Sequence, residues 1–203
     1  MRHFLSGSEF GDSQEVLNQS VPWMYDASNP YLEWFWGSPR LAREHLQRCM
    51  SRHTSEFSLR RAVLLADRDI IGGYVALSGI ELRTCRRADL LTLIQYFRSI
   101  SDDTYVERLK TAEQIFASVA EDELYLSRLG VNPLFRGTGS GKTLLEHMIE
   151  HGTKRGFQRF RLDVCATNVS AIALYSRVGF CIQPETTHHE LPFRYRVMRM
   201  FIA

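Results

Sequence analysis

The sequence predicts an α/β protein whose sheet contains at least one parallel pair of strands. The evidence lies mainly in the last third of the chain, where apolar runs typical of strands alternate with segments of helical periodicity. Strands that alternate with helices in this way form parallel pairs. In chain order we expect a strand over 124–131, a glycine-rich turn over 137–141, a helix with Leu144, Leu145, Met148 and Ile149 on one face, a strand over 160–165, a short helix over 168–177, and strands over 180–182 and 194–202.

The earlier part of the chain predicts helices around one β-hairpin. Residues 12–53 are rich in aromatic side chains and are expected to be helical. Two apolar runs, 62–66 and 70–78, are separated by a charged turn and predict the two strands of a hairpin. Apolar residues at helical spacing over 86–120 predict two helices with a break near 101–103.

Length and composition favour an ordinary globular chain. With 203 residues, 44% apolar and 24% charged, the sequence fits a single domain over 1–203. A net charge of +2 gives no electrostatic case for nucleic acid, and the longest apolar runs are too short to span a membrane. The N-terminal residues lack the apolar core of a signal peptide, so we expect a cytoplasmic protein.

Neither cysteine nor histidine spacing predicts a metal site. The four cysteines are widely spread without a C-x-x-C pair, and we expect them to be reduced thiols. The histidine pair His188-His189 has no third ligand at a suitable spacing. A solvated loop is therefore expected there, and no metal.

The turn Arg136-Gly-Thr-Gly-Ser-Gly-Lys142 is suited to bind phosphate. The first N–H groups of a helix have no partner within the helix, and the helix dipole adds partial positive charge there. Glycines let the backbone approach a ligand, and Arg136 and Lys142 can add charge-assisted contacts. An ordinary strand-to-helix turn is the alternative, but alternating glycines between two basic residues favour a phosphate site.

Two common nucleotide-binding motifs are excluded at this turn. The segment Gly139-Ser-Gly-Lys-Thr143 is similar to the end of a P-loop, but that motif needs a further glycine where Arg136 stands. The remaining chain is also too short for the additional strands of a P-loop domain. A dinucleotide fingerprint would need glycine at the position of Lys142.

Two segments together resemble the GNAT superfamily of N-acetyltransferases. The first, Arg136-Gly-Thr-Gly-Ser-Gly141, fits the cofactor loop R/Q-x-x-G-x-G/A that follows a strand in this family. The second, Asn168-Val-Ser-Ala-Ile-Ala-Leu-Tyr-Ser-Arg-Val-Gly-Phe180, is most similar to the ribosomal-protein N-terminal acetyltransferases. The resemblance is firm over 124–182 and looser over 62–80, and it does not extend to 86–120.

The resemblance implies a mixed, mostly antiparallel central sheet flanked by helices, with a parallel pair of strands at the cofactor site. Residues 86–120 would then be a helical insertion between the third and fourth strands. The implied activity is acetyl transfer from acetyl-CoA, by direct attack in a ternary complex, to a primary amine of a small molecule or a peptide. The alternative is a non-catalytic acyl-CoA-binding or regulatory module on the same fold, which the presence of Tyr175 disfavours.

Site residues follow from the resemblance position by position. The backbone of 129–131 would pair with the pantetheine arm, and the backbone N–H groups of 137–142 would hold the pyrophosphate. Asn168 would touch the cofactor arm, and Tyr175 would stand near the thioester sulfur. The expected cofactor-binding residues are Leu129, Gly130, Val131, Arg136, Gly137, Thr138, Gly139, Ser140, Gly141, Lys142, Asn168 and Tyr175.

Acetyl transfer to an amine needs a base and an acid, because only the neutral amine attacks and a thiolate must leave. A phenol with a pKa near 10 is suited to protonate the thiolate, so Tyr175 is the expected general acid. Asp163 matches an acidic position of the ribosomal-protein acetyltransferases, which carry Glu there, and Glu123 on the preceding strand is its rival as the base. Either could instead be a solvated strand-end acid.

The acceptor amine is the part of the reaction that the sequence defines least. All three tryptophans, Trp23, Trp34 and Trp36, fall in one short aromatic stretch with Asp26 and Glu33 nearby. In the family this region forms one wall of the acceptor groove, and aromatic rings with acids suit an amine on an apolar body. Packing of the first helices on the sheet is the alternative. The 86–120 insertion could cover the groove, form a homodimer contact or enlarge the core.

Overall fold

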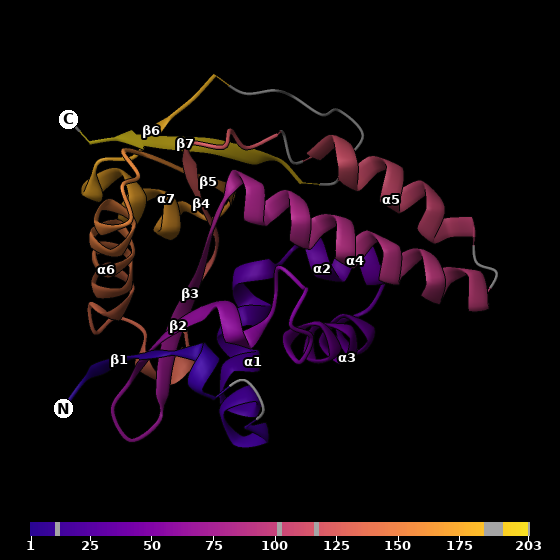
Figure 1. Ribbon diagram of the computed structural model, residues 1–203, viewed down its shortest axis with the longest axis horizontal. Helices are drawn as coiled ribbons and strands as arrows, with labels where there is room; N and C mark the ends of the chain where they lie inside the picture. Colours follow the sequence, from indigo (N-terminus) through magenta and orange to yellow (C-terminus); the bar gives the residue numbers. More distant parts are fainter. Residues whose placement is uncertain (11–12, 101–102, 116–117, 185–192, 203) are drawn as a thin grey trace.

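A computed structural model describes residues 1–10, 13–100, 103–115, 118–184 and 193–202. Within these residues the chain forms one seven-stranded sheet with helices on both faces (Figure 1). The strands are β1 (His3–Ser6), β2 (Ala62–Ala66), β3 (Ile70–Ser78), β4 (Glu123–Val131), β5 (Arg159–Cys165), β6 (Cys181–Ile182) and β7 (Tyr195–Phe201). The α-helices are α1 (Gln14–Ser28), α2 (Tyr31–Trp36), α3 (Pro39–Met50), α4 (Gly79–Ile100), α5 (Asp103–Ile115), α6 (Ser140–Lys154) and α7 (Val169–Val178).

The strand order is β1-β2-β3-β4-β5-β7-β6, and every neighbouring pair is antiparallel except β4 and β5. The predicted fold class is therefore confirmed: a mixed, mostly antiparallel sheet with one parallel pair, flanked by helices. The edge strand β1 is an addition, since the sequence analysis placed no strand before residue 62. It is short, and it pairs with β2 from His3↔Ala66 to Ser6↔Val63.

The helical expectation for 12–53 resolves into three helices with identifiable ends. The Ser13 hydroxyl caps α1, and the Ser38 hydroxyl caps α3, which begins at Pro39. A left-handed Gly37, with φ of +74°, ends α2. The capping serines and Gly37 therefore divide the aromatic stretch into three separate helices.

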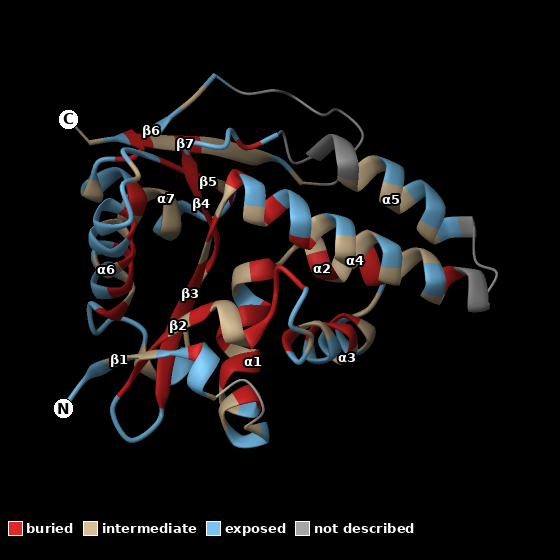
Figure 2. Ribbon diagram, in the orientation of Figure 1, coloured by how far each residue is buried: buried red, intermediate tan, exposed pale blue. Residues whose placement is uncertain are grey.

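The core has two parts, one on each face of the sheet. Helices α1 to α4 pack on one face over fully buried side chains such as Trp23, Met24 and Leu46. Helices α6 and α7 cover the other face over Leu144, Leu145 and neighbouring residues. Figure 2 shows buried residues concentrated along the strands and the inward faces of these helices, while exposed residues line their outer faces.

The helical insertion begins earlier than predicted, at Gly79 instead of 86. Ser78 and Glu81 form a reciprocal capping arrangement: the Ser78 N–H donates to Glu81 at 2.7 Å, and the Glu81 N–H donates to Ser78 Oγ at 3.2 Å. The S-x-x-E spacing was present in the sequence as a helix start signal. Because Phe97 and Leu82 of α4 are buried, this helix is part of the core on its face of the sheet.

The parallel pairing of β4 and β5 is short, and this creates the site. The two strands pair only from Glu123↔Arg159 to Leu126↔Leu162. Beyond Leu126, β4 continues to Val131 with hydrogen-bonded pairing to β3 alone. Between 129 and 131 the edge of β4 that faces away from β3 therefore has no strand partner among the described residues.

Candidate active site

An open cleft of about 710 Å³ lies where β4 departs from β5. Its walls come from the end of β4, the start of α6, the start and middle of α7, and the end of α1. The cleft is lined by Asp26, Ala27, Asn29, Leu129, Gly130, Val131, Phe135, Arg136, Gly137, Gly139, Ser140, Gly141, Asn168, Ser170, Ala171, Leu174 and Tyr175.

The glycine turn leaves the start of α6 open to a ligand. Gly137 and Gly139 have φ of +75° and +80°, a left-handed conformation that strongly favours glycine. A Cβ added at either position would meet no heavy atom within 4 Å, so the space beside both is empty. Gly139 is the N-cap of α6 and offers no side chain to satisfy the first N–H groups of the helix. These features fit a phosphate group held by backbone N–H groups.

Ten of the twelve expected cofactor-binding residues line the cleft. Thr138 and Lys142 do not: the Thr138 hydroxyl donates to the Phe135 carbonyl at 2.7 Å, and Lys142 lies 3.5 Å from Glu146 on the exposed side of α6. Arg136 does line the cleft, but its guanidinium is engaged. It forms an ion pair with Asp26 of α1 and donates to the Val131 carbonyl at 3.2 Å.

Asn168 and Tyr175 both line the cleft, as their spacing on one helix suggests. Asn168 is also the N-cap of α7, because its side-chain oxygen accepts the Ala171 N–H at 3.1 Å. The Tyr175 side chain is 8% exposed, and its hydroxyl makes no hydrogen bond within the described residues. Burial raises the pKa of Tyr175 to about 12, so its phenol stays protonated at neutral pH.

The two candidate bases lie at opposite ends of the parallel ladder. Asp163 is the first residue of β5 beyond the last pair, so it stands where the strands separate. Its buried carboxylate accepts hydrogen bonds from Tyr125 at 3.0 Å and from Arg161 at 3.3 Å. Glu123 begins the ladder at the closed end, where it pairs with Arg199 at 2.9 Å. Neither carboxylate is among the residues that line the cleft; Asp163 stands at the end of the ladder where the strands separate, and Glu123 stands at the opposite end.

With this geometry established, comparison with known proteins identifies the family. A family model described as the acetyltransferase (GNAT) family matches residues 24–180. The chain belongs to this family. The match spans the end of α1, helices α2 and α3, both strands of the parallel pair and the glycine turn.

Relatives and solved structures agree with this family assignment. The chain is 41% identical over 71 residues to the [ribosomal protein bS18]-alanine N-acetyltransferase of Escherichia coli K12, which is 35% of this chain and 48% of that protein. It is 44% identical over 62 residues to the Salmonella typhimurium protein of that name, which is 30% of this chain and 42% of that protein. The chain thus matches about half the length of these curated relatives or less.

The structural likeness extends over nearly the whole chain at low identity, and it concerns the fold. An N-acetyltransferase from Staphylococcus aureus Mu50 matches with a TM-score of 0.65 and 16% identity, covering 98% of this chain and all of that one. The PaiA N-acetyltransferase from Thermoplasma acidophilum, solved in complex with coenzyme A, matches with a TM-score of 0.55 and 15% identity, covering 100% of this chain and 99% of that one.

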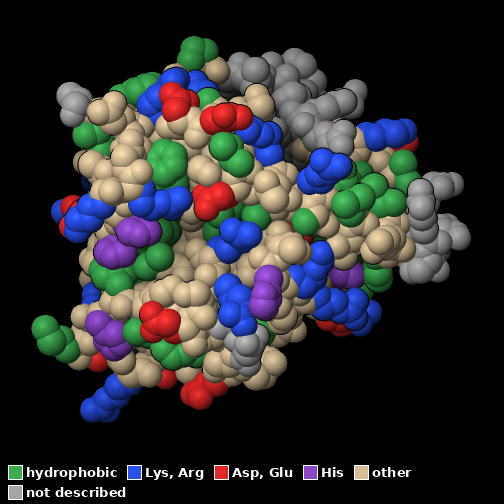
Figure 3. Space-filling model, in the orientation of Figure 1, with side chains coloured by type: hydrophobic (Ala, Val, Ile, Leu, Met, Phe, Trp, Pro, Cys, Tyr) green, Lys and Arg blue, Asp and Glu red, His purple; other side chains and the backbone are tan. Residues whose placement is uncertain are grey.

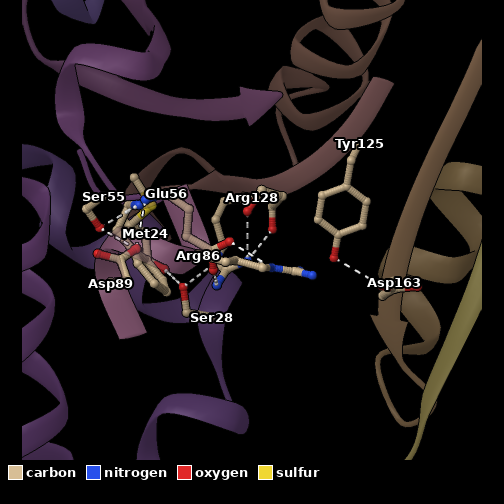
Figure 4. A network of polar contacts seen from close by, with 11 residues as sticks. Met24, Ser28, Ser55, Glu56, Arg86, Asp89, Tyr125, Arg128 and Asp163 are labelled. Carbon is tan, nitrogen blue, oxygen red and sulfur yellow. Dashed lines mark hydrogen bonds and ion pairs between the residues drawn. The ribbon is translucent and has the colours of Figure 1, made fainter. Parts of the chain in front are cut away.

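This GNAT chain also contains a buried charge network that the sequence analysis missed. Arg128 of β4 donates to Ser28 at 2.8 Å and to the Ser127 carbonyl at 2.6 Å, and it lies 3.4 Å from Glu56 (Figure 4). Arg86 of α4 lies 3.3 Å from the other oxygen of Glu56. An arginine inside the apolar run 124–131 was the available signal, because a charge in a buried strand requires partners.

The aromatic stretch and its acids are divided between packing and the cleft. Trp23 and Trp36 are buried in the core, whereas Trp34 is partly exposed. Its ring meets the Phe193 ring edge-on, with the ring centroids 5.9 Å apart. Asp26 lines the cleft, and Glu33 accepts hydrogen bonds from Tyr25 and Asn29. Packing therefore accounts for two of the three tryptophans.

The described residues contain no group of three histidine, cysteine, aspartate or glutamate side chains arranged to hold a metal ion. His188 and His189 lie outside the described residues.

None of the described helices is long and apolar enough to cross a membrane. Basic and acidic side chains are interspersed over the face in Figure 3, in keeping with 25 basic and 23 acidic residues in the chain.

Proposed function

We propose that this chain transfers an acetyl group from acetyl-CoA to a primary amine, as one acetyltransferase domain over 1–203. The observation that carries the proposal is the cleft between β4 and β5. There, a strand edge that has no partner in the described part of the chain, an open left-handed glycine turn at a helix start and a buried tyrosine meet in one space. Each of these features suits a different part of the same co-substrate.

The chain can hold acetyl-CoA with its own backbone and a few side chains. The free edge of 129–131 suits the amide groups of the pantetheine arm, which would add to β4 as a strand does. The N–H groups at the start of α6 suit the pyrophosphate, and Asn168 would contact the arm from α7. Acetyl-CoA would supply an activated acetyl thioester. To contact a phosphate, the Arg136 guanidinium would have to break its ion pair with Asp26 or contact both groups at once.

Tyr175 is proposed as the general acid that protonates the departing thiolate. It lines the cleft, it is a phenol at neutral pH, and its hydroxyl is not engaged elsewhere in the described residues. Of the two carboxylates considered, Asp163 is the one we propose to assist the base step, because it stands where the strands separate. Since Asp163 is buried and bonded to Tyr125, it would act through the tyrosine hydroxyl or a water molecule.

The acceptor class is the next step of the proposal. The curated relatives are named as [ribosomal protein bS18]-alanine N-acetyltransferases, and their match covers less than half of their length. We therefore propose a peptide N-terminus as the first acceptor to test, with small primary amines as the other class.

The deciding experiment measures free thiol released from acetyl-CoA by the full chain. It uses a panel of short peptides with free N-termini, the same peptides with N-terminal acetyl groups, and small primary amines. Thiol release that requires a free amine, with acetylated product seen by mass spectrometry, is the expected result. Tight acetyl-CoA binding without any amine-dependent release would instead favour a non-catalytic acyl-CoA-binding module.

A further inference from the structure

The ion pair between Arg136 and Asp26 joins two walls of the acetyl-CoA cleft. Arg136 directly precedes the glycine turn, and Asp26 lies in the last turn of α1. Both residues line the cleft, although they are 110 positions apart in the chain. The contact is therefore a product of the tertiary fold, and it places a carboxylate against the arginine of the cofactor loop.

Asp26 does not stabilise the helix that carries it. The C-terminal end of a helix bears partial negative charge, so an acid in the last turn is unfavourable. The last turn of α1 has no basic residue of its own. The side chains of Arg136 and Asp26 are 54% and 41% exposed, and ion pairs this exposed contribute little to stability. The main effect of Asp26 is therefore on the electrostatics of the cleft.

The Arg136 guanidinium is held at two points. Its Nε donates to the Val131 carbonyl at the end of β4 at 3.2 Å, and a terminal nitrogen contacts Asp26. A guanidinium binds a carboxylate or a phosphate through the same fork of N–H groups. A phosphate at the start of α6 and the Asp26 carboxylate would therefore compete for Arg136.

Asp26 also opposes a phosphate directly. The phosphates of acetyl-CoA and CoA carry several negative charges, and like charges in an open cleft repel each other. The N–H groups beside Gly137 and Gly139 attract a phosphate, whereas the Asp26 carboxylate in the same cleft repels it. Competition and repulsion both lower the affinity for the co-substrate and for its product.

We propose that Asp26 is an internal competitor for Arg136 that weakens the binding of CoA phosphates and thereby speeds release of the product CoA. This inference rests on the proposed function, because it requires the phosphates to lie at the glycine turn. When CoA binds, the Arg136 guanidinium moves from Asp26 to a phosphate. When CoA leaves, Asp26 takes the guanidinium back. The exchange involves ion pairs alone.

The test is a calorimetric titration with CoA of the full chain and of Asp26→Asn, which keeps the size of the side chain and removes its charge. The variant is expected to bind CoA about threefold to thirtyfold more tightly, the range for losing one exposed ion pair and one repulsive charge. Salt screens exposed charges, so this gain should shrink between about 0.02 M and about 1 M ionic strength. Dissociation of CoA, followed by surface plasmon resonance, should be slower in the variant.

Asp122→Asn is the matched control. Asp122 also pairs with an exposed arginine, Arg159, at 2.8 Å, but it stands at the closed end of the β4–β5 ladder and does not line the cleft. This variant removes the same charge from the chain and should keep the wild-type affinity for CoA. Asp26→Glu retains the charge and should bind CoA more weakly than Asp26→Asn.

The possible results separate this inference from the proposed function. Equal CoA affinity in wild type and Asp26→Asn, or the same gain in Asp122→Asn, would overturn the inference and leave the acetyl-CoA site standing. Weaker binding in Asp26→Asn would also overturn it, because Asp26 would then orient Arg136 for the phosphate. If the wild type binds no CoA, the inference and the proposed function fall together. Thermal melts check folding, and Asp26→Ser provides the same loss of charge if Asp26→Asn does not fold.

Discussion

The hydroxyl of Tyr125 on β4 donates a hydrogen bond of 3.0 Å to Asp163 on β5, across the point where the parallel strands stop pairing. Both side chains are buried, and Arg161 lies 3.3 Å from the other carboxylate oxygen. A phenol that donates to a carboxylate can relay a proton from a neighbouring site to that carboxylate. Burial first, and the Asp163 charge second, raise the pKa of Tyr125, so it remains a donor at neutral pH.

Asp163→Asn is therefore expected to lower kcat by about tenfold to a hundredfold, below the range for direct general-base loss, with acetyl-CoA affinity unchanged. The matched control is Glu123→Gln, another buried carboxylate on the same ladder that lies away from the cleft and pairs with Arg199. That variant should lose stability but keep kcat. Steady-state kinetics beside thermal melts separate the two outcomes, and equal kcat losses in both variants would exclude a specific role for Asp163.

Gly139→Leu is expected to reduce acetyl-CoA affinity by at least about a hundredfold, because a side chain would occupy the space beside the α6 N–H groups. Gly156→Leu is an unusually close control. Gly156 has φ of +90° and open space beside it, but lies at the other end of α6. Both variants carry similar backbone strain of about 1–2 kcal/mol. Calorimetry should show weakened binding only for Gly139→Leu, and a similar affinity for both variants would count against the phosphate site.

Tyr175→Phe is expected to lower kcat by about 10²- to 10⁴-fold with little change in acetyl-CoA affinity, the usual range for loss of a general acid. Tyr74→Phe is its control, since Tyr74 is also buried on this face but bonds to His147 and does not line the cleft. The measurement is kcat over a range of pH for both variants. Wild-type turnover in Tyr175→Phe would mean that water or another group protonates the thiolate.

The sequence predicted the glycine turn, α6 and α7 better than the rest of the chain for a physical reason. The glycine turn and the two helices depend on local rules of φ, capping and periodicity, which are visible in a single stretch such as 137–141. The position of Asp163 relative to Glu123 depends instead on where two strands stop pairing. That is set by tertiary contacts, and neither residue's own sequence neighbourhood reports it.

The same limit explains the network around Arg128 and the early start of α4. Arg128 meets Ser28 and Glu56, which are 100 and 72 positions away in the chain, so no local pattern links them. The start of α4 was predictable, because Ser78 and Glu81 form a local capping motif. Periodicity of the apolar residues alone placed the helix too late, since its first turn lies directly after β3.

His45 gives a prediction for stability against pH. Burial first, and the nearby Arg48 charge second, lower the pKa of His45 to about 4, below its ordinary value near 6.5. Between pH 4 and pH 6.5 the unfolded chain binds a proton at His45 that the folded chain does not. The contribution of His45 to the free energy of unfolding is therefore complete above pH 6.5 and is lost as the pH falls toward 4. The slope is at most about 1.4 kcal/mol per pH unit.

Asp89 acts in the opposite direction over part of this window, because its pKa is raised, so the stability of the wild type alone does not isolate His45. The measurement is the difference in unfolding free energy between wild type and His45→Gln from pH 4 to 7.5, since Asp89 is common to both. The advantage of the wild type should shrink as the pH falls below 6.5. A difference that is constant over this range would show that His45 titrates normally in the folded protein.

The insertion is expected to affect the acceptor and not acetyl-CoA, and α5 provides the means to test it. Arg108 of α5 donates to the Phe35 carbonyl near the end of α2 at 2.9 Å, beside the left-handed Gly37. Its loss would loosen α2, which belongs to the aromatic region that forms one wall of the acceptor groove in the family, while the glycine turn and β4 lie elsewhere (Figure 1). Arg108→Met should therefore raise the acceptor KM several-fold and leave acetyl-CoA affinity unchanged. Lys110→Met removes an exposed cation from the same helix and should change neither. An unchanged acceptor KM in a folded Arg108→Met protein would assign the insertion to packing or assembly.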